Sequence, residues 1–166
     1  MVLNTEQCNM ANYFNASLRN LIHRLRKYRE ILDEELKTEI IRNKDIILKM
    51  ITKEQLYDLG IEGRGIEIWS YQPYTARTIR KKHKKGQPYD RVTLKDTGKF
   101  YSSLDIKFDE TGFYVTSSDS KAEALLKRYG KTIFRLTDAN LKTLLNDYIR
   151  PSLKKKFKAY IQNGRQ

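Results

Sequence analysis

The chain has 166 residues, of which 39% are hydrophobic and 32% are charged, and its formal net charge at pH 7 is +13. The length favours a single domain, 1–166, and the 11 tyrosines, 6 phenylalanines and 1 tryptophan exclude a predominantly disordered chain, because these rings need a core to pack in. Cys8 is the lone cysteine, which excludes an intrachain disulfide and a cysteine-based zinc cluster.

The positive charge indicates an anionic partner, which could be nucleic acid, an anionic membrane face or an acidic protein surface. The N-terminal residues are polar and lack the apolar core of a signal peptide. No apolar run reaches the roughly 18 to 20 residues of a membrane helix. We therefore expect a protein that is made in the cytoplasm and has no membrane partner.

A long helix is predicted at the start of the chain. The first 59 residues contain no glycine and no proline, and apolar residues recur at spacings of three and four. The stripe includes Leu18, Leu21, Ile22, Leu25, Tyr28 and Leu32. One helix or two stacked helices could span 14–51. A single helix of that length would reach roughly 55 Å, so we expect part of it to pack against another subunit.

Shorter elements follow. Thr52 and Gln55 have the spacing of a capping box, which predicts a short helix that ends at Gly60. We then expect a turn at 63–65, a short strand over 66–71 and a very basic helix over 75–85 that ends at Gly86.

The second half begins with an irregular loop at 86–97, with an extended piece at 92–94 and a short helix after it. Alternating hydrophobic residues on either side of 109–112 predict a β-hairpin. We expect next a helix over 122–129, a short strand at 133–136 and a final helix, capped by Thr137, that Pro151 kinks or restarts.

These elements predict an α+β fold: a long N-terminal helix, a small antiparallel β-sheet with a hairpin, and a C-terminal helix with a basic tail. Within a single domain 1–166, we expect a helical arm at 1–52, an α+β core at 53–150 and a basic C-terminal tail at 151–166.

The segment 55–104 carries a series of turn-forming and aromatic residues: Gln55-Leu56-Tyr57, Gly63 and Gly65, Tyr71-x-Pro73-x-Thr75, Gly86-Gln87-Pro88, Asp90-Arg91-Val92-Thr93-Leu94, and Asp96-Thr97-Gly98 before an aromatic residue and Ser102-Ser103. It resembles the virion-morphogenesis and tail-completion proteins of tailed phages, particularly those of Bacteroides-like hosts. The resemblance implies a subunit of a ring between portal and tail, and a structural role for the Leu94-x-Asp96-Thr97-Gly98 segment before a helix.

Two enzymatic interpretations of Asp96 have less support than the structural role. Asp96-Thr97-Gly98 is also the tripeptide of aspartic proteases, but lysines flank it here where that site needs apolar neighbours. Asp96 with Asp105-Ile106-Lys107 has a loose likeness to metal-dependent nucleases. His23 and His83 lack acidic or cysteine neighbours at ligand spacing. We expect no catalytic residue, metal site or cofactor, and we expect Asp96 or Thr97 to cap the next helix.

Basic residues gather in three clusters, which we call by their positions. The middle cluster contains Arg77, Arg80, Lys81, Lys82, Lys84 and Lys85. The C-terminal cluster contains Lys154, Lys155, Lys156 and Lys158, with Arg150 and Arg165 on either side. The N-terminal cluster contains Arg19, Arg24, Arg26, Lys27 and Arg29. A run of charge is usually a solvated face, but clusters of one sign repel one another and favour a counter-charge. An acidic neighbouring protein is the leading partner, and the DNA backbone is the second.

The leading hypothesis is therefore a structural, non-enzymatic subunit of the phage neck, acting as a head-to-tail connector, adaptor or tail-completion ring. Its expected partners are copies of itself, the portal and other neck or tail proteins, with nonspecific contact to packaged DNA, and its expected location is the virion. The alternatives are a sequence-independent DNA-binding protein and, less favoured, a metal-dependent nuclease.

Overall fold

The computed structural model describes residues 5–163, and the side chains of residues 18–162 among them, so Cys8 lies outside the described side chains. The chain divides into two compact units: a helical unit, 1–40 with 149–166, and a mixed unit, 41–148. These boundaries differ from the expected ones at 52 and 150. Residues 41–52 fall in the mixed unit because Ile47 and Ile51 are fully buried in its core.

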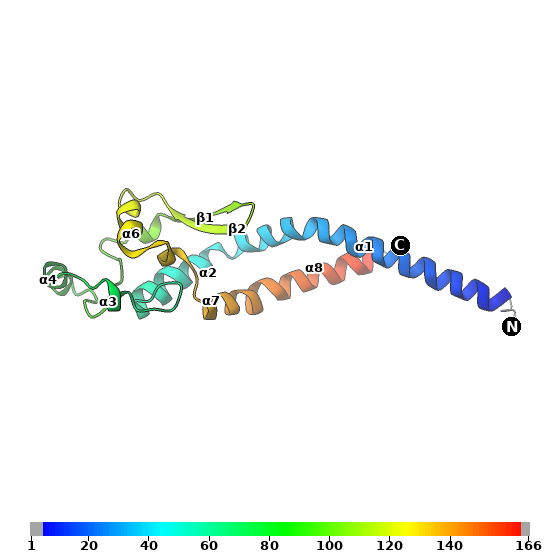
Figure 1. Ribbon diagram of the computed structural model, residues 1–166, viewed down its shortest axis with the longest axis horizontal. Coiled ribbons are helices and arrows are strands. Elements are labelled where there is room, and N and C mark those ends of the chain that lie inside the picture. The colour runs from blue at the N-terminus through cyan, green and yellow to red at the C-terminus, as the bar shows by residue number, and fades with distance from the viewer. Residues whose placement is uncertain (1–4, 164–166) are drawn as a thin grey trace. The chain divides into compact units, whose positions relative to one another are not determined.

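The helical unit consists of two helices that run side by side in opposite directions (Figure 1). Most of α1 (Thr5–Arg42) and all of α8 (Arg150–Asn163) belong to it. The buried ring of Tyr28 packs on Phe157 and Tyr160, with centroids 4.8 and 5.2 Å apart. Residues 151–163 of the expected basic tail therefore lie in α8, and this helix packs on α1.

The mixed unit begins with helix that continues almost without interruption. After α1, α2 spans Lys44–Lys49 and a π-helical segment, η1, spans Met50–Leu59. The predicted capping box at Thr52 is wrong, because Thr52 lies inside this helix and its hydroxyl donates to the Leu48 carbonyl at 2.7 Å. The predicted end at Gly60 is confirmed: Gly60 has φ 67°, which favours glycine.

The next segment turns at Gly63 and Gly65, as predicted, but the expected strand over 66–71 is absent from the structure. A single helical turn, α3 (Ile68–Tyr71), takes its place, and Glu67 makes one isolated bridge to Ile61. Ile68 is fully buried and its N–H donates to the Gly60 carbonyl at 2.9 Å. This bond holds the start of α3 against Gly60, so the Ile68 N–H is not available to a neighbouring strand.

The predicted basic helix is confirmed as α4 (Ala76–Lys84), and the loop after it, at 86–98, leads into α5 (Lys99–Ser102). The predicted hairpin is confirmed as β1 (Leu104–Asp109) paired antiparallel with β2 (Gly112–Ser117). Asp109 lies opposite Gly112, and the Asp109 carboxylate accepts the Thr111 N–H at 2.8 Å. This bond stabilises the tight turn.

The last part of the chain is helical. It comprises α6 (Ala122–Tyr129), a 3-10 turn η2 (Lys131–Phe134), α7 (Asp138–Thr143), a π-helical segment η3 (Leu144–Ile149) and α8. The predicted strand at 133–136 is wrong, because Phe134 stacks on Phe100 from a 3-10 turn, at a centroid distance of 5.9 Å. The Thr137 hydroxyl accepts the Asn140 N–H, so the predicted cap is confirmed. Pro151 does not end the helix, and a π-helical segment directly precedes α8.

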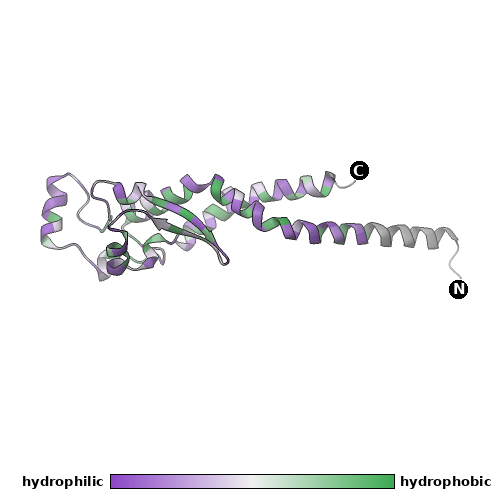
Figure 2. Ribbon diagram, turned by 90° about the horizontal axis from the view of Figure 1, so that it is seen from above, coloured by the Kyte–Doolittle hydropathy of each residue, from purple (hydrophilic) through white to green (hydrophobic). Residues whose placement is uncertain are grey.

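The predicted α+β class is confirmed: a long N-terminal helix, a two-stranded antiparallel sheet and a C-terminal helix are all present. The buried hydrophobic residues of the mixed unit come mostly from its helices and from the hairpin, and include Ile51, Leu56 and Val115. Figure 2 shows hydrophobic and hydrophilic residues interspersed along these elements. No helix in the described part of the chain combines the length and the hydrophobicity that crossing a membrane requires.

Candidate functional site

The strongest candidate site is the basic helix α4 of the mixed unit. The Thr75 hydroxyl caps it by accepting the Thr78 N–H at 3.3 Å. Between Tyr74 and Tyr89 the sequence contains no acidic residue. The exposed cations of the helix are Arg77, Arg80, Lys81 and Lys84. We call these four residues the α4 basic face.

Lys82 differs from its neighbours because it points inward. Its side chain is buried, and its ammonium donates to Thr93 Oγ1 at 3.1 Å and to the Lys95 carbonyl at 2.7 Å. Gln87 Oε1 lies 3.4 Å away as a weaker acceptor. Burial holds the pKa of Lys82 below its ordinary value, although the charge of Asp96 opposes this shift. Lys82 therefore anchors the loop 86–98 and does not belong to the exposed cluster in which the sequence placed it.

Two tyrosines hold the same loop. The Tyr74 hydroxyl accepts the N–H groups of Thr93 and Leu94, at 2.9 and 3.1 Å. The Tyr101 hydroxyl donates to the Thr93 carbonyl, and burial raises its pKa. Leu94 has φ 54°, a left-handed conformation that is rare for leucine and that these bonds maintain. We call Tyr74, Lys82, Thr93 and Tyr101 the loop clamp.

The Asp96-Thr97-Gly98 segment serves the same clamp. Asp96 pairs with the Lys85 ammonium, and its carbonyl accepts the Gln87 side-chain amide at 2.7 Å. The Lys85 ammonium lowers the pKa of Asp96. The predicted cap by Asp96 is wrong, because Gly98 is the cap residue, at φ 91°, and Thr97 Oγ1 accepts only a long 3.4 Å bond from the Lys99 N–H. Asp96 instead ties the loop to α4.

The C-terminal cluster lies in the helical unit and also divides in two. Lys154, Lys155 and Lys158 are exposed. Lys156 pairs with Glu35 and, at 3.0 Å, with the fully buried Glu39, and the Glu35 carboxylate raises the pKa of Lys156. Lys156 therefore joins α8 to α1. The middle and C-terminal clusters belong to different units.

The acids of the nuclease interpretation are each held by a separate lysine. Asp105 pairs with Lys44 at 2.7 Å, and this contact lowers the pKa of Asp105, while Asp96 pairs with Lys85. His83 lies beside the Tyr89 ring, and His23 is exposed on α1. Over the described side chains, no group of three or more His, Cys, Asp and Glu residues is placed to hold a metal ion.

Two buried polar residues, Gln55 and Glu62, have contacts that the sequence did not predict. Gln55 donates to the Arg135 carbonyl at 3.0 Å and accepts from the Thr137 N–H at 2.9 Å, so it joins η1 to the start of α7. Glu62 is fully buried and accepts from Arg64 at 2.9 Å, while its second oxygen has no hydrogen-bond partner among the described residues. The burial of Gln55 could have been predicted, because Gln55 falls at the helical spacing of the apolar residues around it. No feature of the sequence indicates that Glu62 is buried.

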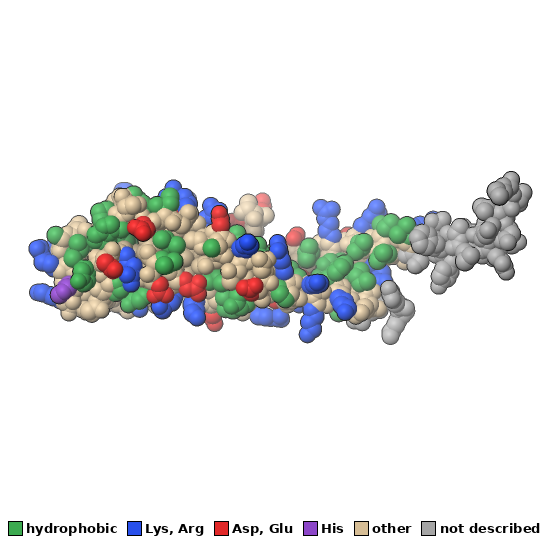
Figure 3. All heavy atoms as spheres, turned by 90° about the horizontal axis from the view of Figure 1, so that it is seen from below, with side chains coloured by type: hydrophobic (Ala, Val, Ile, Leu, Met, Phe, Trp, Pro, Cys, Tyr) green, Lys and Arg blue, Asp and Glu red, His purple; other side chains and the backbone are tan. Residues whose placement is uncertain are grey.

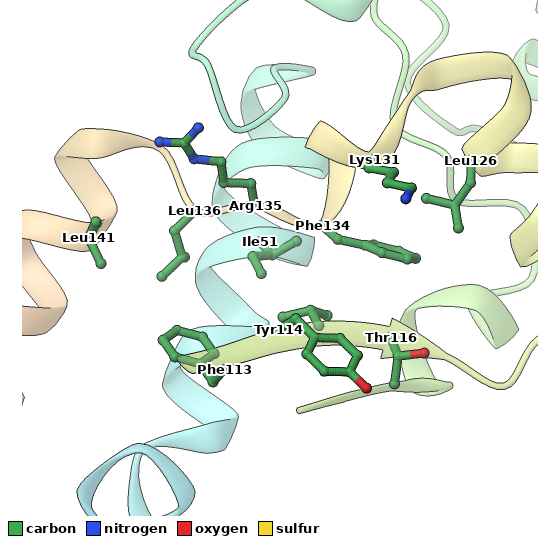
Figure 4. A pocket seen from close by; sticks show the side chains of 11 residues that line it. Ile51, Phe113, Tyr114, Thr116, Leu126, Lys131, Phe134, Arg135, Leu136 and Leu141 are labelled. Carbon is green, nitrogen blue, oxygen red and sulfur yellow. The ribbon is translucent and has the colours of Figure 1, made fainter. Parts of the chain in front are cut away.

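A groove of about 620 Å³ lies beside the hairpin (Figure 4). Its lining is mostly hydrophobic and consists of Ile51, Phe113, Tyr114, Val115, Thr116, Leu126, Lys131, Phe134, Arg135, Leu136 and Leu141. These residues include two cations, Lys131 and Arg135, and no carboxylate.

Comparisons of the chain with protein-family models, with curated proteins and with solved structures found no match in any of the three.

Proposed function

We propose that this protein is a structural subunit of the neck of a tailed phage, where copies of it form a ring between portal and tail. The observation that carries the proposal is the loop clamp. Together with the Lys85–Asp96 pair, the loop clamp fixes the loop 86–98 on α4 and leaves the four cations of the α4 basic face exposed. A rigid face of one charge suits docking onto an acidic surface.

The chemistry of this face favours binding over catalysis. Its side chains are arginines and lysines, which donate hydrogen bonds to carboxylates or phosphates but do not supply a nucleophile and base pair. One exposed ion pair contributes only about 0.2–1 kcal/mol. A ring repeats each contact in every subunit, so even weak pairs add up to stable docking on an acidic rim of the portal.

DNA is the second candidate partner, because the same four cations can bind the phosphate backbone without contacting the bases. Binding to duplex DNA would then show a steep dependence on salt concentration, since bound cations release counterions. Binding to an acidic protein would instead need that particular protein. The two partners can thus be separated by titrating the purified chain with duplex DNA.

The proposal is tested by deleting the gene from a phage that encodes the chain and viewing the lysate by electron microscopy. A neck subunit predicts filled or emptied heads and separate tails, and expression of the wild-type chain in trans should restore joined particles. Normal joined particles in the absence of the chain would contradict the proposal.

A further inference from the structure

The groove of the mixed unit runs along one edge of the hairpin. Within the described residues the sheet has two strands, so β2 pairs with β1 along one edge and its other edge has no strand beside it. Successive side chains of a strand leave opposite faces. Phe113, Tyr114, Val115 and Thr116 are consecutive residues of β2, yet all four line the groove. The groove therefore follows the unpaired edge of β2 and not one face of the sheet.

The other wall of the groove is mostly hydrophobic. Figure 4 shows Lys131, Phe134 and Arg135, from η2 and the residue after it, across the groove from β2. A strand edge offers backbone N–H and C=O groups to an extended peptide, and a facing hydrophobic wall accepts the alternate side chains of that peptide. The groove combines both features in a volume of about 620 Å³.

The edge of β2 lacks the features that usually prevent pairing with another strand. Exposed edges are commonly protected by charged residues or by proline. The strand β1 contains Asp105, Lys107 and Asp109, whereas β2 contains neither a charged residue nor a proline. Elsewhere on the surface, exposed hydrophobic side chains are interspersed with charged ones, as Figure 3 shows, which is ordinary for proteins. Of the two strands, β2 is the one suited to pairing with a partner.

The charge around the groove is positive. Lys131 and Arg135 are both exposed, and no carboxylate lines the groove. Arg135 has an acidic neighbour in Asp138, but the two charged groups are 3.8 Å apart, which is beyond hydrogen-bond distance, and Asp138 is 93% exposed. Segment 112–143, which supplies all but one of the lining residues, contains six arginines and lysines and three acids. An acidic occupant complements this charge.

We propose that the groove binds an extended, acidic segment of a partner protein, which pairs with β2 as a third strand. Hydrophobic side chains at alternate positions of the segment pack against Phe134 and Val115, and its carboxylates pair with Lys131 and Arg135. A second copy of this chain is not the occupant, because its net charge is +13 and its acid-rich segment 30–39 lies in the helix α1. This inference goes beyond the proposed function, since the groove and the α4 basic face share no residue.

The probe is a fluorescein-labelled heptapeptide of alternating glutamate and valine, and its binding to the purified full-length chain is measured by fluorescence anisotropy. The peptide should bind saturably, whereas a peptide with lysine in place of each glutamate should bind at least about tenfold more weakly. A third peptide keeps the acidic sequence but is N-methylated at the central valine and at the next glutamate, so neither of its edges can pair fully with β2. It should also lose about tenfold in affinity.

A pair of matched variants places the binding in the groove. Lys131→Glu combined with Arg135→Glu should weaken binding of the acidic peptide at least about tenfold. The control is Arg77→Glu combined with Arg80→Glu, which makes the same change of charge on the α4 basic face and should keep the affinity within about twofold at physiological salt. All four side chains are exposed, and circular dichroism verifies that both variants are folded.

Hydrogen exchange measured by NMR tests the strand pairing itself. In the complex, alternate backbone amides of β2 should exchange about ten times more slowly than in the free chain, because they donate to the peptide. No binding of the acidic peptide up to about 1 mM, equal binding of the N-methylated peptide, or an equal loss in the α4 control would overturn the inference. So would binding of dodecanoate without binding of either acidic peptide, which would make the groove a site for a small apolar anion.

Discussion

The Lys82 ammonium donates a 2.7 Å hydrogen bond to the Lys95 carbonyl, so a lysine from the most basic helix of the chain is buried beneath the loop that follows it. This bond separates two kinds of cation within one cluster. Lys82 stabilises the fold, whereas Lys81 and Lys84 on either side remain available to a partner.

Lys82→Met should destabilise the mixed unit. The methionine retains much of the apolar volume but leaves the Lys95 carbonyl without its donor and removes one of the two N–H donors to Thr93 Oγ1, a loss of about 1–3 kcal/mol in the free energy of unfolding. Lys81→Met is the control and should change it by no more than about 0.5 kcal/mol. Urea unfolding of both variants measures the difference, and equal stabilities would show that the buried bonds contribute nothing.

Charge reversal of the α4 basic face should block particle assembly without unfolding the chain. In Arg77→Glu, Arg80→Glu, Lys81→Glu and Lys84→Glu combined, only exposed side chains change. The circular dichroism spectrum should stay that of the wild type, while complementation of the gene deletion should fall to background. High salt should weaken the wild-type contact, because exposed charges are screened beyond roughly 8–10 Å. Full complementation by the folded variant would show that the face is merely solvated.

Gln55→Leu should be among the most damaging single changes in the core. It removes the acceptor of the Thr137 N–H and the donor to the Arg135 carbonyl, in a position where water has little access. Each unsatisfied buried group costs about 1–3 kcal/mol. Thermal unfolding should show a lower midpoint than for Leu59→Gln, which swaps the same residue types at the surface. A variant as stable as the wild type would mean that the Gln55 bonds are not formed.

Two glycines should respond differently to alanine. At Gly63 an added Cβ would lie 2.4 Å from Arg135 Cβ and 2.7 Å from the Arg135 carbonyl oxygen, so the backbone must shift. At Gly98 there is room for a Cβ, but φ is 91°, which costs an alanine about 1 kcal/mol. Gly63→Ala should therefore lower the free energy of unfolding more than Gly98→Ala. The reverse order in urea unfolding would refute the close contact at Gly63.

The Asp96–Lys85 pair should make stability depend on acid pH. Because the Lys85 ammonium holds the pKa of Asp96 below its ordinary value of 3.8, the pair stabilises the fold above that pH and loses its effect as the pH falls through the lowered pKa. The pair is exposed, so we expect only about 0.2–1 kcal/mol. Unfolding of wild type and Asp96→Asn should differ at about pH 7 and converge at about pH 2. A difference that persists in acid would assign the effect to another contact.

Turns, helix ends and helix caps were predictable from the sequence, because residues close to them in the chain determine them. The hairpin follows from alternation around Asp109 and Gly112, the end of η1 from Gly60, and the start of α7 from Thr137. The strands predicted at 66–71 and 133–136 did not form. A strand needs a second strand to pair with, and the local sequence pattern does not show whether one is present. Charge counting also could not show which lysine of α4 points inward, although Lys82 lies one turn from Ile79 on the same helix face.

Quantitative mass spectrometry of purified particles tests the central proposal most directly, namely that the chain is a structural component of a phage particle. The chain should be present at a fixed ratio to the portal protein, and this ratio should survive washing in moderate salt. Its abundance in infected cells together with its absence from purified particles would contradict the proposed function.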